Sequence, residues 1–122
     1  MSEFIAIRKE RITGTKHKIP KVCLSLPKGE FRFYKSTCEL LNIDPVKQGI
    51  MFYINKEEKK VRVELEEKQD DNYHLSDRKG YKAFTNKVMG ILFSDLFDLD
   101  METSHYFNFK KKENTFIMTL IL

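Results

Sequence analysis

Two stretches of the sequence place cationic side chains at corresponding positions. "LSLPKGEFRF" covers residues 24–33 and "LSDRKGYKAF" covers residues 75–84, and both begin Leu-Ser, carry Lys-Gly at their fifth and sixth places and end in Phe. Lysine and arginine neutralise backbone phosphates of nucleic acids when they gather on one face of a protein. The repeated phrase therefore predicts a basic face with two-fold character, to which each half of the chain contributes one set of cations.

The candidate phosphate-binding residues also include two arginines near the N-terminus. Residues 1–35 contain nine Lys or Arg and three acidic residues, so the net charge of +4 is concentrated at the front of the chain. A basic N-terminal arm of this kind can add minor-groove or phosphate contacts to double-stranded DNA. The candidates are, in chain order, Arg8, Arg11, Lys28, Arg32, Lys35, Arg78, Lys79, Lys82 and Lys87.

Motifs for enzymatic chemistry are missing from the sequence. It contains no phosphate-binding loop, dinucleotide fingerprint, nucleophile elbow or zinc-protease motif. The three histidines are scattered, and the acidic stretch "DLFDLDME" (95–102) lacks the glycine and the distal glutamate of a calcium loop. We therefore expect neither an enzyme nor a metal or cofactor site.

Length and composition predict a single folded domain. The chain has 122 residues, of which 41% are hydrophobic, including ten Phe. Cys23 and Cys38 show no metal-binding spacing and are expected to be reduced core thiols. Because no apolar run approaches the roughly 18 residues of a membrane span and no signal peptide is evident, we expect a cytoplasmic protein without membrane association.

Hydrophobic periodicity predicts the elements of the first half. Residues 3–9 form a short strand, which a basic arm connects to a second strand where Val22, Leu24 and Leu26 alternate with other residues. A short helix is expected in "STCELLNI" (36–43), with Ser36 or Thr37 as its N-cap and with Asn42 and Pro45 at its end. A hairpin follows over residues 48–67, with its turn at "NKEEKK" (55–60).

The second half repeats this order. A strand and loop near residue 75 precede a helix in "TNKVMGILFSDLF" (85–97), capped by Thr85 or Asn86, and a last hairpin turns at "KKKEN" (110–114). Its final strand, "TFIMTLIL" (115–122), is apolar on both faces, which predicts either a central strand or an edge that pairs with another chain. An offset of 51 pairs Phe33 with Phe84, and an offset of 55 pairs Phe52 with Phe107.

We therefore expect an α+β domain with mostly antiparallel strands and two short helices, built from a duplicated β-α-β-β unit. The N-terminal strand and basic arm occupy residues 1–20, and residues 21–122 form one domain of two repeats, 21–67 and 72–122. Since about 45 residues bury too little apolar surface alone, the two repeats should wrap around each other.

The first repeat resembles a known family. Gly29, Phe31 and Phe33, the helix end "ELLNI" (39–43), Gly49 and the strand "VRVEL" (61–65) are similar in order to the swapped-hairpin AbrB-like domain of bacterial transition-state regulators and antitoxins. In that family two chains interleave into a small barrel that binds DNA. The resemblance implies a swapped-hairpin-like barrel made by the two halves of this chain, with a role in transcription regulation. The chain is also similar to small proteins of phages and mobile elements.

Two functions stay open at this point. One is a DNA-binding, regulator-like protein that uses a pseudo-two-fold basic face and binds double-stranded DNA. The alternative is a non-enzymatic protein interaction or structural module, with a protein partner or a homo-oligomer. The acidic segments 64–71 and 95–102 and the apolar C-terminal strand favour this alternative.

Overall fold

The structure, a computed structural model, describes residues 19–121. The predicted strand over residues 3–9, nearly all of the basic arm, and with them Arg8 and Arg11, lie outside the described residues. The elements within the described range are, in chain order, β1 (Lys21–Ser25), β2 (Glu30–Tyr34), α2 (Lys35–Leu41), β3 (Gln48–Asn55), β4 (Lys60–Glu67), β5 (Ser76–Arg78), β6 (Tyr81–Thr85), α3 (Lys87–Phe97), β7 (Ser104–Lys112) and β8 (Thr115–Leu120).

The strands form one antiparallel sheet in the order β3-β4-β8-β7-β1-β2-β6-β5. The predicted class, mostly antiparallel strands with two helices, is therefore confirmed. The β-α-β-β unit was wrong by one strand, because two strands precede the helix in each half. The reason in the first half is a tight turn after β1, where the N–H of Lys28 donates to the carbonyl of Ser25 at 3.2 Å and Gly29 adopts a φ of 66°.

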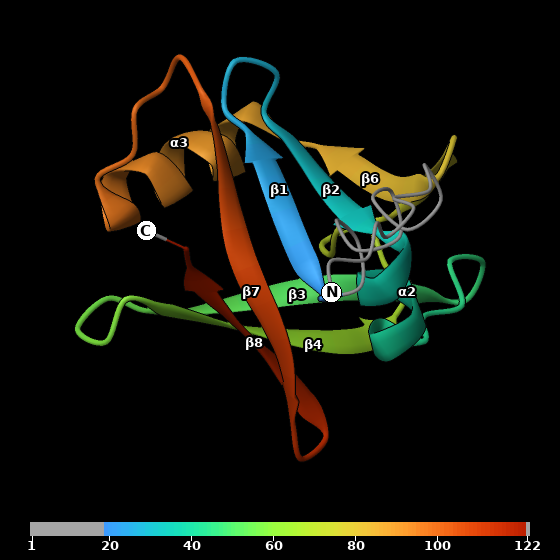
Figure 1. Cartoon of the computed structure of the whole chain (residues 1–122). Helices are drawn as coiled ribbons and strands as arrows, with labels where there is room; N and C mark the ends of the chain where they lie inside the picture. The colour runs from blue at the N-terminus through green and yellow to red at the C-terminus, as the bar shows by residue number, and fades with distance from the viewer. Residues whose placement is uncertain (1–18, 122) are drawn as a thin grey trace, which may run out of the picture.

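The sheet curls strongly, so that its two ends approach each other (Figure 1). Ile50 of the edge strand β3 forms an isolated antiparallel bridge with Tyr73, which shortly precedes the other edge strand, β5. The two backbone hydrogen bonds between Ile50 and Tyr73 measure 2.8 and 2.9 Å. The result is a curled half-barrel whose concave side holds the core.

Phenylalanine dominates the core because the alternating positions of each strand place Phe on the concave face. Phe31 of β2 stacks on Phe84 of β6 with ring centroids 4.7 Å apart, and Phe93 of α3 meets Phe31 edge-on at 5.1 Å. Phe93 also contacts Phe52 and Phe107. Helix α3 therefore packs on the concave side and joins strands from both halves of the chain.

The helix ends agree with the sequence in part. Asn86 caps α3 as predicted, because its side chain accepts a hydrogen bond from the backbone N–H of Met89 at 2.9 Å. Asn42 ends α2 in the left-handed conformation, which confirms that prediction. The predicted N-cap of α2 at Ser36 or Thr37 was wrong, since α2 begins at Lys35 and Tyr34 precedes it without a side-chain cap.

Strand β8 lies inside the sheet. It pairs with β4 on one side and with β7 on the other, so its backbone is not an open edge. Phe116 and Met118 face the core and are buried, whereas Ile117 and Thr119 are half-buried on the convex face. Of the two explanations for an apolar final strand, the central position holds. Both predicted hairpins, β3-β4 and β7-β8, are confirmed.

Candidate nucleic-acid interface

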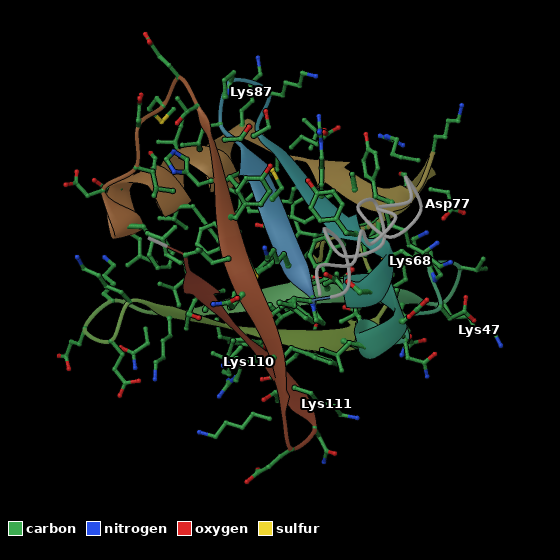
Figure 2. The ribbon with its side chains drawn as sticks, viewed as in Figure 1. Lys47, Lys68, Asp77, Lys87, Lys110 and Lys111 are labelled. Atoms are coloured by element: carbon green, nitrogen blue, oxygen red, sulfur yellow. The ribbon has the colours of Figure 1, made fainter. Side chains whose placement is uncertain are left out.

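The cations predicted from the repeated phrase lie in several places. Lys28 precedes β2 and Lys35 follows it, so the two lie at opposite ends of a strand about 17 Å long. Lys87 begins α3 beside the β1-β2 turn, where the N–H of Asn86 donates to the carbonyl of Gly29 at 2.8 Å. Lys28 belongs to this turn, so it lies at the same end of the molecule as Lys87, which is labelled in Figure 2.

A second group belongs to the β5-β6 hairpin. Arg78 and Lys79 lie at its turn, while Lys82 forms an ion pair with Asp77 on the neighbouring strand. Lys82 lies opposite Phe33, on the side of the sheet that faces the core. Arg78, Lys79 and Lys82 thus lie close together in one hairpin, but the side chain of Lys82 points away from the convex face of the sheet.

Arg32 has partners of its own on the convex face. Its guanidinium forms an ion pair with Glu30 and lies 5.4 Å from the centre of the Tyr81 ring. The hydrogen bond that Arg32 donates to Glu30 raises the pKa of Arg32 above its ordinary value, so the charge is firmly held. The members of the predicted set that lie within residues 19–121 are therefore divided among the end of the molecule near the β1-β2 turn, the start of α2, the β5-β6 hairpin and the convex face of β2.

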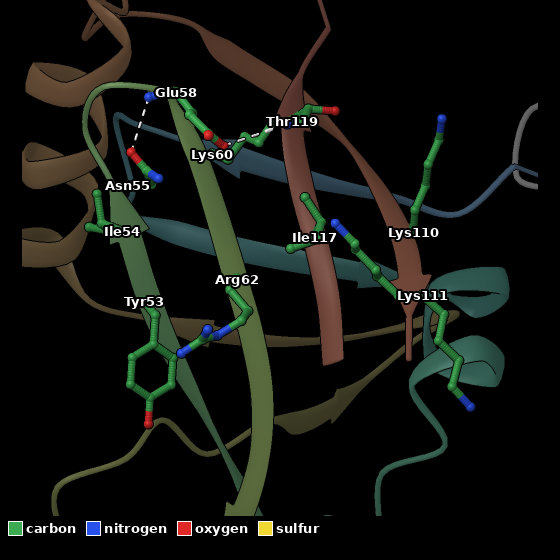
Figure 3. Close-up of a pocket in the computed structure, with 11 residues that line it drawn as sticks. Tyr53, Ile54, Asn55, Glu58, Lys60, Arg62, Lys110, Lys111, Ile117 and Thr119 are labelled. Carbon is green, nitrogen blue, oxygen red and sulfur yellow. Dashed lines mark hydrogen bonds and ion pairs between the residues drawn. The ribbon is translucent and has the colours of Figure 1, made fainter. Parts of the chain in front are cut away.

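Cations from two other hairpins line one groove in the surface, which we call the basic groove. The groove lies on the outer, convex face of the curled sheet, over β3, β4, β8 and β7, and has a volume of about 660 Å³ (Figure 3). The cations that line it are Lys60, Arg62, Lys110, Lys111 and Lys112. The other lining residues are Tyr53, Ile54, Asn55, Glu58, Ile117 and Thr119.

Strand pairing sets the order of side chains across the basic groove. Tyr53 lies opposite Arg62, Arg62 opposite Ile117, and Ile117 opposite Lys110, which gives one row across β3, β4, β8 and β7. The flanking residues of these strands, including Val61, Val63 and Met118, point the other way and are buried in the core. Successive side chains of a strand point to opposite faces of the sheet. Because Val61, Val63 and Met118 point into the core, the residues of this row point to the solvent-facing side.

Two ion pairs organise the β3-β4 side of the basic groove. Arg62 Nε lies 2.7 Å from Glu64 Oε2, and the Arg62 guanidinium lies 4.7 Å from the centre of the Tyr53 ring. The hydroxyl of Tyr53 donates to Glu66 at 3.1 Å, and this hydrogen bond raises the pKa of Tyr53 above its ordinary value. Lys60 lies 3.7 Å from Glu58. The tyrosine therefore stays neutral and is held on two sides.

The β7 side supplies charge without local compensation. Lys110, Lys111 and Lys112 are all exposed. Within residues 19–121, none of the three lies within ion-pair distance of a carboxylate. Lys111 lies opposite Phe116, on the side of the sheet that faces the core, so Lys110 and Lys112 are the lysines of β7 on the same side as Arg62 and Lys60. These two uncompensated ammonium groups beside Arg62 and Lys60 make this surface suitable for binding a polyanion.

Sequence reasoning missed this surface, although part of its signal is visible. The run "KKK" at 110–112 was interpreted as part of a turn, Lys60 was placed in the predicted turn over residues 55–60, and Arg62 was placed in the second strand of the predicted hairpin. The cations of β4 and those of β7 lie about 50 positions apart in the sequence. They come together because β8 pairs with both strands.

Comparisons with protein families, with curated proteins and with solved structures found no match for this chain. In the part of the chain that the structure describes, no helix has the length and apolar character needed to cross a bilayer. The same residues contain no cluster of three or more His, Cys, Asp or Glu side chains that could hold a metal ion.

Proposed function

We propose that this protein binds nucleic acid through the basic groove and acts as a DNA-binding, regulator-like protein. The observation that carries the proposal is the meeting of four cationic side chains from two hairpins, Lys60, Arg62, Lys110 and Lys112, on one face of the sheet. Two of them, Lys110 and Lys112, lack a carboxylate partner among the described residues. Phosphate groups would provide the missing counter-charge, with release of bound counterions as a driving force.

We also propose that the two halves are copies of one unit, folded together as a swapped-hairpin-like pseudo-dimer. Both halves have the element order strand, strand, helix, strand, strand. Three strand pairs join the halves: β2 with β6, β4 with β8, and β1 with β7. In the first two of these pairs, each strand meets its counterpart from the other half. An arrangement in which each half completes the sheet of the other is what the resemblance to the AbrB-like domain implies.

The test is a salt titration of binding to a fluorescent random-sequence DNA duplex, read by anisotropy. The variant Lys110→Gln/Lys111→Gln/Lys112→Gln is compared with Lys28→Gln/Lys79→Gln/Lys87→Gln, which removes the same charge from other exposed surfaces. We expect the first variant to reduce the slope of log K against log salt by up to about three, and the second to change it by less than about one.

The outcome separates two binding surfaces. Loss of binding in the Lys28/Lys79/Lys87 variant with normal binding in the groove variant would move the site to the face predicted from the sequence. Absence of binding by the unmodified protein at low salt would refute binding of double-stranded DNA. Thermal unfolding of each variant controls for loss of the fold.

One observation favours a protein interaction module as the second candidate function. The outer face of α3 presents Val88, Ile91 and Leu92 to solvent, and Val88 is 77% exposed. Residues three and four apart lie on the same face of a helix, so the three side chains form a continuous apolar strip. Self-association through this strip predicts a concentration-dependent sedimentation coefficient that the variant Val88→Ser/Ile91→Ser abolishes.

A further inference from the structure

Tyr53 is an exposed aromatic ring at the β3 side of the basic groove, held in a fixed orientation. Its hydroxyl is bound by Glu66 at 3.1 Å, and Arg62 lies 4.7 Å from its ring centre. Arg62 is itself fixed by Glu64 at 2.7 Å. Despite these contacts, 38% of the surface of Tyr53 remains exposed. A large ring that is both held and accessible loses little conformational entropy when a flat ligand stacks on it.

We infer that the basic groove binds an unpaired polynucleotide strand, with a base stacked at Tyr53 and with phosphates at the lysines of β7. This inference rests on the proposed function and specifies its ligand. Proteins that bind single strands combine a positively charged track for the backbone with aromatic side chains on which bases stack. The basic groove has both features, and they lie on neighbouring strands.

The spacing of the two features suits a short run of nucleotides. Tyr53 and Lys110 are the first and last members of the row across β3, β4, β8 and β7. Adjacent strands lie about 4.8 Å apart, so three steps across the sheet separate the two backbone positions by about 14 Å. Ile117, midway in the row, offers an apolar contact for a base or sugar between the stacking end and the cationic end.

The carboxylates near Tyr53 do not oppose this assignment. The charge of Glu64 is paired with Arg62, and Glu66 accepts the hydrogen bond of Tyr53. Both acids act on the protein's own side chains, at the end of the groove assigned to the base. The phosphates are assigned to the opposite end, where Lys110 and Lys112 are unpaired within the described range.

An unpaired strand is favoured over a duplex because of what Tyr53 can contribute. Within a duplex the faces of the bases are covered by their neighbours, so an aromatic ring outside the helix finds no base to stack on. The lysines serve either ligand, since phosphate contacts do not depend on strand pairing. Tyr53 therefore distinguishes the two ligands.

The experiment measures the affinity of the full chain for three fluorescent probes with equal numbers of phosphates: oligo(dT), oligo(rU) and a blunt DNA duplex. The protein variants are Tyr53→Leu, which removes the ring, and Tyr53→Phe, which keeps the ring and removes the hydroxyl. We expect tighter binding of the unpaired probes than of the duplex. Tyr53→Leu should weaken the unpaired probes about tenfold and the duplex less than about twofold, while Tyr53→Phe keeps most of the affinity.

Each outcome has a distinct meaning. Tighter binding of both oligo(dT) and oligo(rU) than of the duplex, with loss of that advantage in Tyr53→Leu, would support the inference. Equal or tighter duplex binding, with no effect of Tyr53→Leu, would overturn the inference. In that case the proposed function stands if Lys110→Gln/Lys111→Gln/Lys112→Gln still weakens duplex binding. Absence of binding to all three probes would overturn both.

Discussion

Arg32 lies directly opposite Ala83 where β2 pairs with β6, and Ala83 follows Arg32 by 51 positions in the sequence. The pairing of β4 with β8 has the same property, because Arg62 lies opposite Ile117, 55 positions later. These are the two offsets at which residues of the predicted repeat match. The β2-β6 and β4-β8 junctions are thus each centred on a pair of corresponding residues, as two-fold symmetry requires, and this supports the proposal of an internal duplication.

The strand pairs that join the halves predict that neither half folds alone. Cleavage of the chain in the exposed segment near residue 70 would expose the edges of β1, β2 and β4 in one fragment and of β6, β7 and β8 in the other. We expect fragments 1–70 and 71–122 to be unfolded separately and to recover native circular dichroism when refolded together. A cooperative thermal transition of either fragment on its own would contradict this expectation.

Removal of the Thr37 hydroxyl should destabilise the protein, because this hydroxyl binds the backbone at the start of β1. The buried hydroxyl accepts a hydrogen bond from the N–H of Lys21 at 2.7 Å and donates to the carbonyl of Lys21 at 2.5 Å. Thr37→Val keeps the shape but leaves both backbone groups unsatisfied, which should lower the free energy of unfolding by about 1–3 kcal/mol. Thr37→Ser keeps the hydroxyl and should cost clearly less in urea denaturation. Equal effects of the two substitutions would refute this role.

Two glycines with positive φ allow a matched test of packing. Gly29 has a φ of 66° and Gly80 a φ of 88°. A Cβ at Gly29 would lie 2.8 Å from Lys87 Cα, whereas a Cβ at Gly80 would meet nothing within 4 Å. Gly80→Ala should cost about 1 kcal/mol of stability from backbone strain alone. Gly29→Ala should cost at least about 1 kcal/mol more, because the backbone at the start of α3 must move.

Denaturation curves of both alanine variants measure this difference directly. Similar midpoints for the two would show that the contact between the β1-β2 turn and α3 is looser than the structure indicates.

The environment of the two cysteines predicts that their thiols react slowly in the native protein and that the protein loses stability at alkaline pH. Cys23 is 2% exposed, and Cys38 Sγ donates to the carbonyl of Phe33 at 3.2 Å. Burial raises the pKa of Cys38, against the opposing effect of Lys82. Because the folded state disfavours the thiolate, the contribution of Cys38 to stability is complete below its unfolded pKa of about 8.5 and declines as pH rises beyond it.

Reaction with a chromogenic disulfide reagent should therefore be slow in the native protein and rapid in denaturant. The variant Cys38→Ala should show a weaker loss of stability between neutral and alkaline pH than the unmodified chain. Rapid labelling of both thiols under native conditions would contradict the burial described here.

Local patterns in the sequence predicted much of the fold. The hairpins over β3-β4 and β7-β8 and the cap at Asn86 follow from alternation and from a side chain that bonds nearby backbone. The strand β1 was predicted, but its reversal into β2 was not, because the turn at Gly29 was interpreted as a loop leading to the helix.

Long-range pairing explains why the candidate site was missed. Whether Arg62 and Lys110 share a surface depends on β8, which lies between β4 and β7 and joins strands of different halves. No local sequence pattern indicates which strands lie next to β8 in the sheet. Conversely, Lys82 was chosen because it belongs to the second copy of the repeated phrase. Its position opposite Phe33 depends on the register between β2 and β6, which the sequence does not reveal.

The central claim is that nucleic acid binds the basic groove, and amide chemical-shift mapping on isotope-labelled protein tests it most directly. Titration with oligo(dT) and with a short duplex, each at low salt, should give its largest shifts in β3, β4, β7 and β8, around Tyr53, Arg62 and Lys110. Shifts concentrated at Lys28, Lys79 and Lys87, or no shifts with either ligand, would contradict the claim.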